Sequence, residues 1–467
     1  MNVLCIISDT VRRDHLGCYG AKQIHTPCLD RLAADSVVFD RAYSGSFPTV
    51  PCRAELFTGR FVFPYLDWGP LPADEVTTAE ALSAAGHHCA MVTDNLHLCR
   101  PKYDYARGFH SRIRVRGQWY DNYQPADAAF TWPCAEEKLG KRDRGRMQQY
   151  LRNVSTRRGE EDFFAPRVAQ EAIHWLERNH DRSPFFLYVD LFDPHEPWDP
   201  PDRYLRLYAN GQSDPERIIL PIFGRADRYS AEELASIRAL YAAELTMVDA
   251  WIGRLLEALD ALGRRDDTAV VFLSDHGMFL GERNLLGKMG GRGEGLVGWP
   301  TFRELSRVPF MFRVPGVTPG RRRAFVHPGD VAPTLVSLAG VERPARMTAA
   351  DLTPVLRGET ESVRDLAVSS WSLRDWSVHR PSVIRTDEWA LVYWRLGVRP
   401  ELYHLSTDPG EERDVFAENL PVARELHRRY LEFLRQNNVS AKNYWPRRGL
   451  WTLGSRTSPS RFNLAHE

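Results

Sequence analysis

The sequence predicts an α/β fold, in which a large central, mixed but mostly parallel sheet is flanked by helices and followed by a smaller C-terminal α+β unit. Segments with strand patterns alternate with helical segments through most of the chain. The strand segments 3–7, 185–191 and 268–273 are almost continuously apolar, as expected of strands buried on both faces of a parallel sheet. With 467 residues, the chain is too long for one small core, so a large domain plus a smaller one is expected.

The elements of the large domain follow from local signals along the chain. After the first strand, Pro27 fits the first turn of a helix that runs to Ala34, with Thr26 as its cap. Gly86 and Gly340 are expected to end two further helices, because glycine readily adopts the left-handed conformation that closes a helix. The other expected elements are strands at 37–39 and 88–93 and helices at 77–85, 167–179, 240–262 and 332–339.

Residues 108–162 interrupt this alternation. They are rich in Arg, Gln, Tyr and Trp and show little periodicity, so we interpret them as an insertion or lid that covers the site and sets substrate choice. Within them, Gln118, Trp119 and Tyr120, with Tyr123 nearby, form either a stacking surface or plain packing of the insertion.

The smaller unit is predicted at residues 362–437, which leaves a catalytic domain at 1–361 and a tail at 438–467. Strand patterns at 382–385, 389–394 and 401–405 precede a long helix at 421–436. The tail is rich in Arg, Ser and Trp and is expected to pack as an arm.

The composition is typical of a soluble globular protein, with 43% hydrophobic and 26% charged residues. Lys plus Arg equals Asp plus Glu, at 61 each, so the charge indicates neither a nucleic-acid nor a membrane partner. The N-terminal apolar run is too short for a signal peptide and has no basic region before it. The seven cysteines, all between Cys5 and Cys134 and without a CxxC pair, predict reduced thiols in a cytoplasmic protein.

The run from Thr49 to Gly59 is the most informative motif. Pro51 fits the first turn of a helix, which places Thr49 just before the helix N-terminus, where free N–H groups and the macrodipole favour an anion. Arg53, one turn further on, can reach back to this hydroxyl or to a bound oxyanion. Alone, the motif equally describes an ordinary helix with a surface threonine.

Two further motifs follow buried strands. Asp9 ends the first strand, and Asp275 and His276 come after the strand that ends at Leu273. In open α/β sheets, ligands bind at the edge formed by the carboxyl ends of the strands, where carboxylates and an imidazole can share one metal ion. Taken alone, Asp9 is equally a helix cap, and Asp-His-Gly is equally a turn.

Together these motifs resemble the sulfatase family of the alkaline phosphatase superfamily, which includes phosphonate monoester hydrolases and phosphodiesterases. Its signature, Cys or Ser followed by x-Pro-x-Arg and later Thr-Gly, matches residues 49–59 except at Thr49. The other matches, in the family's order, are Asp9 with Asp14-His15-Leu16-Gly17-Cys18-Tyr19-Gly20, His97-Leu98, Pro194-His195-Glu196-Pro197, Asp275-His276-Gly277, Gly281-Glu282, Gly287-Lys288 and Val308-Pro309.

The resemblance implies roles for these residues. Asp9, Asp275 and His276 are expected to bind one divalent metal ion (Mn²⁺, Zn²⁺ or Ca²⁺), with the Thr49 hydroxyl completing the set. Lys288 is expected to contact the leaving oxygen or the anion. His195 is expected to bind a substrate oxygen or act as the general acid, His97 to activate water, and Asn95 to donate a hydrogen bond to the substrate.

The chain departs from the family pattern at several positions. Sulfatases convert their Cys or Ser to formylglycine, which is impossible for Thr49. Thr10 replaces the second aspartate of the opening motif, Asn95 stands where a lysine is usual, and Arg283 and Asn284 occupy the stretch that normally supplies a second histidine. Losing the second aspartate removes a carboxylate ligand and makes binding of Ca²⁺ less secure.

Three functions are therefore in competition. The first is hydrolysis of phosphodiesters or phosphonate monoesters by unmodified Thr49, whose pKa the metal and Arg53 would lower. The second is sulfuric ester hydrolysis, as in a sulfatase or arylsulfatase. The third is a catalytically inactive binding protein on the same scaffold. The expected binding partner is a small phosphate, phosphonate or sulfate ester. Assembly into a homo-oligomer is also possible.

Overall fold

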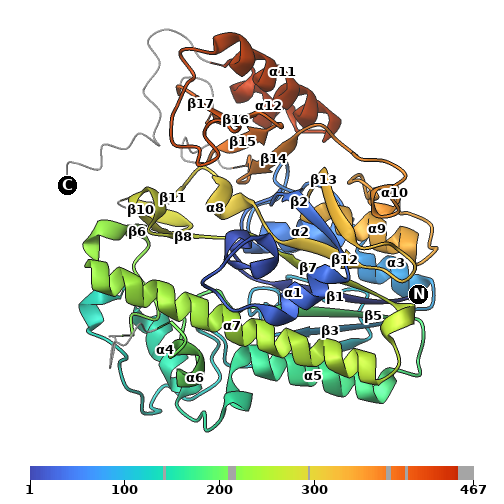
Figure 1. The fold of residues 1–467 in the computed structure, drawn as a ribbon, viewed down its shortest axis with the longest axis vertical. Helices are drawn as coiled ribbons and strands as arrows, with labels where there is room; N and C mark the ends of the chain where they lie inside the picture. The colour runs from blue at the N-terminus through green and yellow to red at the C-terminus, as the bar shows by residue number, and fades with distance from the viewer. Residues whose placement is uncertain (140–143, 209–216, 293–294, 375–379, 395–397, 451–467) are drawn as a thin grey trace.

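A central sheet lies between two layers of helices, and a smaller unit with its own sheet sits at one end of the molecule (Figure 1). The computed structural model describes residues 1–139, 144–208, 217–292, 295–374, 380–394 and 398–450. This architecture confirms the predicted α/β class with an additional C-terminal unit.

The central sheet contains, in spatial order, β13 (Gly320–Val326), β2 (Val37–Ala42), β12 (Phe310–Arg313), β7 (Thr268–Ser274), β1 (Asn2–Ser8), β5 (Phe185–Leu191), β3 (His88–Thr93) and β4 (Ser111–Arg114). Strand β12 is antiparallel to its neighbours β2 and β7, whereas the other neighbouring pairs are parallel. The sheet is therefore mixed and mostly parallel, as predicted.

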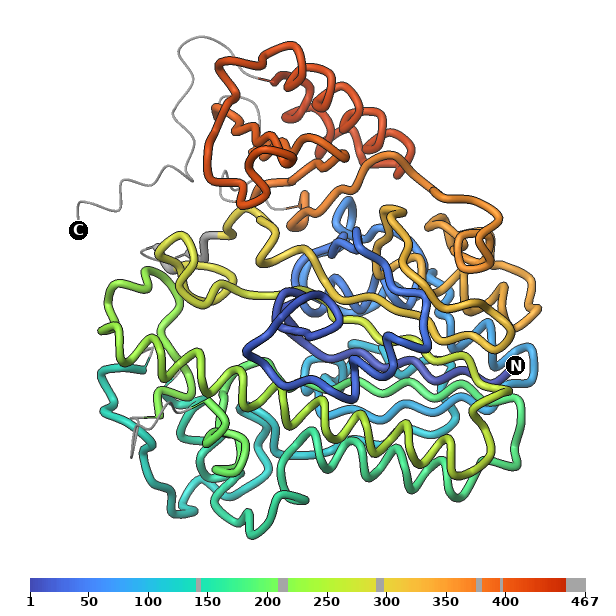
Figure 2. Tube along the Cα trace, in the orientation of Figure 1, coloured from blue at the N-terminus to red at the C-terminus, as the bar shows by residue number. Residues whose placement is uncertain are grey.

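Both faces of this sheet are buried by helices. One layer contains α1 (Pro27–Ala34), α5 (Phe164–Asn179) and α7 (Ala231–Ala261), and the other contains α2 (Thr49–Thr58), α3 (Thr78–Ala84) and α9 (Val331–Leu338). Helices α5 and α7 run side by side in Figure 2. Side chains of β1 alternate between the two cores: Leu4 and Ile6 face the first layer, while Val3, Cys5 and Ile7 face the second. This double burial explains the continuous apolar pattern of the central strands.

Several helix ends are fixed by side chains. Thr77 and Glu80 form a reciprocal capping box at the start of α3. Ser230 and Glu233 do the same for α7, so that this helix begins at Ala231, earlier than the predicted residue 240. Thr26 precedes α1 as expected, but its hydroxyl accepts a hydrogen bond from the N–H of Gly17 (2.9 Å) instead of capping the helix.

The C-terminal unit contains an antiparallel sheet in the order β14 (Ala367–Ser370), β15 (Ser382–Arg385), β16 (Trp389–Tyr393) and β17 (Glu401–His404), with α11 (Leu420–Gln436). A parallel β-bridge joins Ser46 to Ser370, and the buried Glu411 pairs with Arg385 and accepts from the N–H of Arg303. In the tail, Asn443 donates to the backbone oxygen of Pro64 (3.2 Å), so this part packs on the large domain. Residues 451–467 of the predicted arm lie outside the described residues.

The region 108–162 is more regular than its sequence suggests. Its beginning supplies β4, the edge strand of the central sheet, and its end supplies α4 (Arg144–Val154). Residues 140–143 of this predicted insertion lie outside the described residues. The remaining short elements are α6 (Asp202–Leu205), β6 (Gly224–Arg225), β8 (Phe279–Leu280), β9 (Leu285–Gly287), β10 (Met289–Arg292), β11 (Gly295–Gly298), α8 (Arg303–Ser306), α10 (Thr353–Leu356) and α12 (Ala441–Tyr444).

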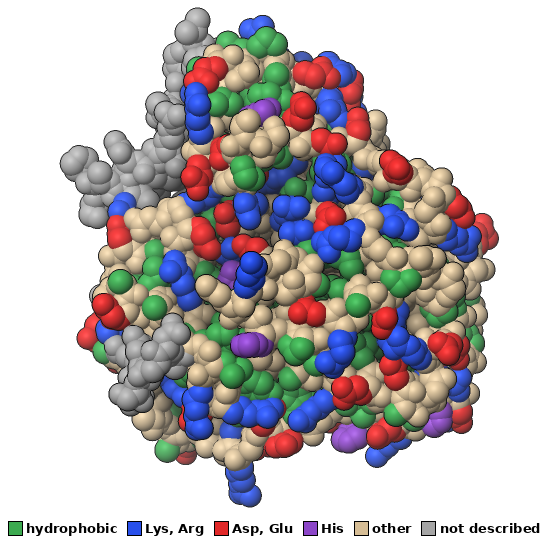
Figure 3. Space-filling model, in the orientation of Figure 1, with side chains coloured by type: hydrophobic (Ala, Val, Ile, Leu, Met, Phe, Trp, Pro, Cys, Tyr) green, Lys and Arg blue, Asp and Glu red, His purple; other side chains and the backbone are tan. Residues whose placement is uncertain are grey.

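All seven cysteines are free thiols in the structure. Acidic and basic side chains are interspersed on the face seen in Figure 3, in keeping with their equal numbers of 61. Among the described residues, we find no helix with both the length and the apolar character needed to cross a membrane.

His327 gives the stability of the large domain a defined pH dependence. Its imidazole is buried, and Nδ1–H donates to the backbone oxygen of Tyr43 (2.8 Å). Burial, reinforced by the charge of Arg364, lowers the pKa of His327 to about 3. The unfolded chain binds a proton here below about pH 6.5, while the folded chain does not, so the free energy of unfolding falls as the pH falls through this window.

We expect His327→Gln to reduce this slope by up to about 1.4 kcal/mol per pH unit, measured by urea denaturation at several pH values between about 4 and 7. The matched control is His25→Gln, because His25 is exposed. An unchanged slope in His327→Gln would contradict the buried neutral state of this imidazole.

Candidate active site

The carboxyl ends of three neighbouring strands bring three aspartates together. Ser8 of β1 pairs with Ser274 of β7, and Asp9 and Asp275 follow these two residues directly. Asp190 is the last but one residue of β5, on the other side of β1. Because the three strands are parallel, their carboxylates emerge at the same edge of the sheet, and all three aspartates are fully buried.

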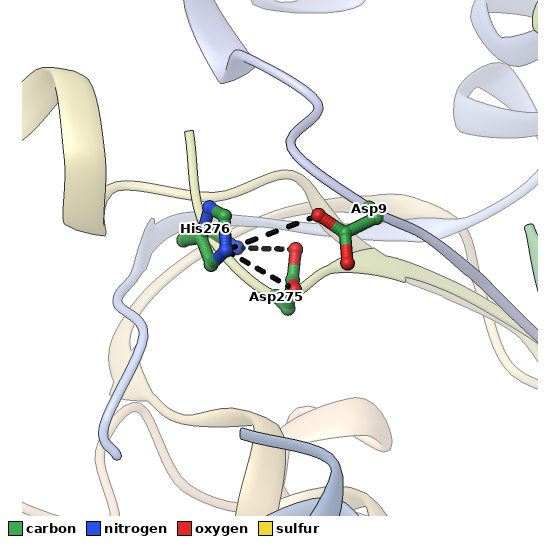
Figure 4. A group of neighbouring side chains, drawn as sticks. All are labelled: Asp9, Asp275 and His276. Carbon is green, nitrogen blue, oxygen red and sulfur yellow. Dashed lines mark hydrogen bonds and ion pairs between the residues drawn. The ribbon is translucent and has the colours of Figure 1, made fainter. Parts of the chain in front are cut away.

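Asp9, Asp275 and His276 converge on one point (Figure 4). One ligand atom from each lies within 4.8 Å of the others. His276 Nε2 is 3.4 Å from Asp275 Oδ2 and 3.9 Å from Asp9 Oδ1. The structure thus brings together the three residues that the sequence predicted as metal ligands, and their oxygen and nitrogen donors suit a divalent cation.

Thr49 lies beside this group. It is the first residue of α2, with Pro48 before it, one position further into the helix than predicted. Its Oγ is 3.1 Å from His276 Nε2. Because His276 Nδ1–H donates to the backbone oxygen of Gly277 (3.0 Å), Nε2 carries a lone pair that accepts the hydroxyl proton. Burial lowers the pKa of His276 to about 3, despite the opposing charge of Asp275, so the ring is neutral.

Arg53 binds carboxylates instead of reaching back to Thr49. Its Nε and Nη2 hold both oxygens of Asp190 (3.1 and 3.0 Å), and its Nη1 lies 3.0 Å from Asp9 Oδ2 and contacts Asp275 Oδ2. The expected approach to the nucleophile is therefore not observed, because three buried acids surround the guanidinium. Arg53 itself is completely buried, so it acts as the fixed cation of the cluster.

Asp190 was not identified from the sequence as a site residue. It is the only carboxylate in an otherwise apolar strand, and the hydroxyl of Tyr188 donates to its Oδ2 (2.6 Å). A lone acid in a buried strand is a signal that could have found it, because such a charge requires a buried partner. Its role is to fix the plane of the Arg53 guanidinium.

The charges of the cluster fit a cation. Burial, followed by repulsion from Asp275, raises the pKa of Asp9 well above its usual range. For Asp275, burial is outweighed by Arg53 and His276, so its pKa lies below its usual range. Asp9 Oδ2 is buried without a hydrogen bond, although Arg53 lies close to it. A cation at this point would compensate the buried negative charge that Arg53 alone leaves unbalanced.

Thr10, which replaces the family's second aspartate, serves as a neutral support for Asp9. Its hydroxyl donates to Asp9 Oδ1 (2.5 Å), and its N–H donates to Asp275 Oδ1 (3.0 Å). The backbone of Thr10 has φ of 63°, an unusual conformation for a β-branched residue. The strain aims its N–H at Asp275, so Thr10 orients both carboxylates without adding charge.

A pocket of about 630 Å³ opens beside Thr49. Pro48, Lys288, His97 and His195 line it, and Lys288 Nζ lies 3.5 Å from His276 Nε2. The three predicted catalytic side chains Lys288, His97 and His195 therefore line one pocket, each is at most 8% exposed, and Lys288 connects this pocket to the metal-ligand group.

Both pocket histidines are neutral. Burial lowers the pKa of His97 and of His195 well below the usual range, and the positive charge of Lys288 acts in the same direction. His195 Nδ1–H donates to the backbone oxygen of Glu196 (2.8 Å), and its ring stacks on Phe192 at 4.2 Å between centroids. A neutral histidine accepts a proton more readily than it gives one, which favours Lys288 over His195 as the general acid.

Asn95 is fully buried and does not line the pocket. Its Oδ1 accepts from the N–H of His97 (3.1 Å), while Nδ2 is buried without a hydrogen bond. In this structure Asn95 orients the His97 loop, and its predicted contact with substrate stays a prediction.

Gln118 joins the two loops that carry the pocket histidines. Its Nε2 donates to Asp94 Oδ2 (3.1 Å) and to Asp193 Oδ1 (2.9 Å), and these aspartates lie near His97 and His195 in the sequence. The sequence singled out Gln118 only as part of a cluster without a role. Its function here is structural, because one amide satisfies two buried acids.

Comparison with known proteins agrees with this geometry. Residues 1–341 match the family described as Sulfatase, which covers well over half of the chain. The chain belongs to the sulfatase family. Residues 301–437 match the C-terminal region of N-sulphoglucosamine sulphohydrolase, which spans the predicted smaller unit. This sulfatase-family protein is accordingly a metal-dependent ester hydrolase.

Individual relatives of this sulfatase-family protein differ in the esters that they are named for. It is 28% identical to the choline-sulfatase of Rhizobium meliloti over 455 residues, which is 90% of this chain and 82% of the relative. It is 24% identical to the multifunctional alkaline phosphatase superfamily protein of Trinickia caryophylli, over 88% of this chain and 90% of the relative. The phosphonate monoester hydrolase of Agrobacterium radiobacter has the same fold, with a TM-score of 0.72 and 24% identity over 95% of this chain and 96% of that one.

Proposed function

We propose that this protein hydrolyses phosphodiesters or phosphonate monoesters with Thr49 as the nucleophile. The observation that carries the proposal is the unmodified hydroxyl of Thr49 at the family's nucleophile position, within 3.1 Å of His276 Nε2. A threonine cannot become the formylglycine of sulfatases. Its hydroxyl can form a phosphoryl-enzyme intermediate, because phosphorus esters of threonine are open to attack by water.

The proposed reaction has two steps. Thr49 Oγ gives its proton to water in the pocket and forms a bond to phosphorus, while the bond from phosphorus to the leaving oxygen breaks and Lys288 Nζ donates a proton to that oxygen. Water then attacks phosphorus and releases Thr49, with the water proton accepted by neutral His97. His195 is also neutral, and its Nδ1–H is already used by the backbone oxygen of Glu196. Its Nε2 would therefore accept a hydrogen bond from a water molecule that in turn binds a substrate oxygen. The N–H groups at the start of α2 and the Lys288 ammonium would stabilise the non-bridging oxygens.

Asp9, Asp275, His276 and Thr49 would hold one divalent cation, with Mn²⁺, Zn²⁺ and Ca²⁺ as candidates. When bound, it would supply positive charge that lowers the pKa of the hydroxyl and polarises the ester. The imidazole favours Mn²⁺ or Zn²⁺, and the neutral Thr10 in place of an acid disfavours Ca²⁺.

Sulfuric ester hydrolysis is the second candidate, supported by the names of relatives such as choline-sulfatase. Against it stands Thr49, since a sulfated threonine lacks the aldehyde-hydrate route by which formylglycine releases sulfate. The inactive-protein alternative has less support, because Asp9, Arg53, Asp275, His276 and Lys288 all meet at one site.

The test is a matched panel of an aryl phosphodiester, an aryl phosphonate monoester and an aryl sulfate, assayed on the same protein after loading with Mn²⁺, Zn²⁺ or Ca²⁺. We expect kcat/KM for the two phosphorus esters to exceed that for the sulfate by at least about a hundredfold, a difference of roughly 2.7 kcal/mol in transition-state binding. Turnover of the sulfate alone would overturn the proposal.

A further inference from the structure

The pocket extends toward solvent from Pro48 and Lys288, which lie next to Thr49 and His276, and its charge changes along the way. Lys288, His97 and His195 are buried at the inner end. Arg100 is half-buried and Arg146 is exposed, so these two lining residues mark the outer end. The outer end lies on the lid region and on the loop after β3, which also carries His97.

Tyr120 organises this outer end. The guanidinium of Arg100 donates to the Tyr120 hydroxyl and, through Nη1, to the hydroxyl of Tyr103 (3.3 Å). The guanidinium of Arg146 lies over the Tyr120 ring, 4.6 Å from its centroid. Tyr120 in turn meets the ring of His97 edge-on at 6.2 Å, which connects the two arginines to the inner pocket.

Arg100 places a positive charge in the outer pocket. Among its lining residues, Asp67 pairs with Arg380 (3.0 Å), and Glu196 lies 3.3 Å from His195 Nδ1. Within the part of the chain that the structure describes, no carboxylate lies within ion-pairing distance of Arg100. Tyrosine hydroxyls use only part of its five donors, and guanidinium forks favour anions that present two neighbouring oxygens, such as carboxylate, sulfate or phosphate.

The space between the two ends suits a ring. Trp68, Tyr120 and Trp371 line the pocket, and aromatic faces of this kind stack on planar or ring-shaped groups. Trp68 also packs edge-on against His97 at 4.9 Å, which keeps the aromatic wall next to the reacting end.

We propose that Arg100, supported by Tyr120 and assisted by Arg146, forms a second anion-binding subsite, so that the preferred substrates carry an anionic group on a ring, opposite the ester that is cleaved. The inference builds on the proposed function, because it assigns the ester end of the substrate to Thr49. It assigns a role in substrate choice to the lid region, through Tyr120 and Arg146, and to the loop after β3, through Arg100.

The test measures binding rather than turnover. Benzenesulfonates with a carboxylate or a second sulfonate at the 3- or 4-position, which carry one charge at the end that faces Thr49, are titrated calorimetrically into metal-loaded protein, together with carbamoyl analogues of the same shape that lack the second charge. We expect the best charged isomer to bind about tenfold more tightly than its carbamoyl analogue, as for one charge-assisted contact that is partly exposed. Arg100→Gln should reduce this preference to less than about twofold, and Arg100→Lys should keep part of it.

Arg178→Gln is the matched control, because Arg178 is exposed on α5 and does not line the pocket. Equal binding of charged and carbamoyl compounds to the unaltered protein, for every isomer, would overturn the subsite. A preference that survives in Arg100→Gln would also overturn it. Because these titrations need no catalysis, and Thr49→Ala should show the same preference, failure of the subsite and failure of the Thr49 mechanism give different results.

Discussion

Replacing Thr49 with alanine is expected to lower kcat/KM for aryl phosphodiesters and phosphonate monoesters by at least about a thousandfold, because the reaction loses its nucleophile. Thr49 Oγ is the hydroxyl that lies 3.1 Å from His276 Nε2, and alanine has no oxygen that could attack phosphorus from this position. The measurement is steady-state turnover of the unaltered and the altered protein, each loaded with the same metal ion.

Thr49→Ser is the matched control. It keeps the hydroxyl and removes one methyl group, so we expect it to retain a substantial part of the activity. Acid quenching during turnover should trap a phosphoryl group on residue 49 in the unaltered protein and in Thr49→Ser, and mass spectrometry should find none in Thr49→Ala. Undiminished turnover in Thr49→Ala would show that another group attacks phosphorus.

Replacing Arg53 with methionine is expected to lower the free energy of unfolding by about 3–5 kcal/mol, because it leaves buried carboxylates without their counter-charge. Arg53, Asp9, Asp190 and Asp275 are all fully buried, and the guanidinium contacts all three acids. The measurement is urea denaturation of the metal-free protein. The matched control is Arg31→Met, because Arg31 is 63% exposed and its ion pair with Glu257 should contribute less than about 1 kcal/mol.

The same denaturation measurement with added divalent metal tests the role of Arg53 further. A divalent cation at Asp9 and Asp275 would supply part of the charge that Arg53→Met removes, so it should stabilise the variant more than the unaltered protein. A loss of less than about 1 kcal/mol in Arg53→Met, or no additional stabilisation by metal, would contradict the role of Arg53 as the fixed cation of the cluster.

The sequence predicted the long central strands better than the short strands and the edges of the sheet, and it missed the four-residue buried strand β12. Strands β1, β5 and β7 were evident because both faces are covered, which demands an apolar side chain at nearly every position. Strand β13 was missed, since its first half is the arginine run Arg321-Arg322-Arg323 with alternating half-buried and exposed side chains. Strand β4 was missed for a similar reason: it is a four-residue edge strand whose arginines Arg112 and Arg114 are exposed.

The candidate site, like the fold, could be predicted only in part. Asp9, Asp275 and His276 could be predicted as neighbours, because parallel strands place their carboxyl ends at one edge. The partners of Arg53 could not be predicted, because a motif within one helix does not determine which acids of other elements will contact its arginine. The link from Gln118 to Asp94 and Asp193 depends on how the lid folds against two separate loops, and no local pattern in the sequence encodes this.

The three acids around Arg53 determine how much negative charge a substrate can bring into the site. With Asp9, Asp190 and Asp275 ionised, the guanidinium leaves two negative charges, which one divalent cation neutralises completely. Lys288, whose Nζ lies 3.5 Å from His276 Nε2, can then balance one negative charge on the ester. Phosphodiesters, phosphonate monoesters and sulfate monoesters each carry one such charge, whereas a phosphate monoester carries close to two at neutral pH. Phosphate monoesters would therefore be excluded by electroneutrality, without any steric barrier, and the choice among the others would be made by Thr49.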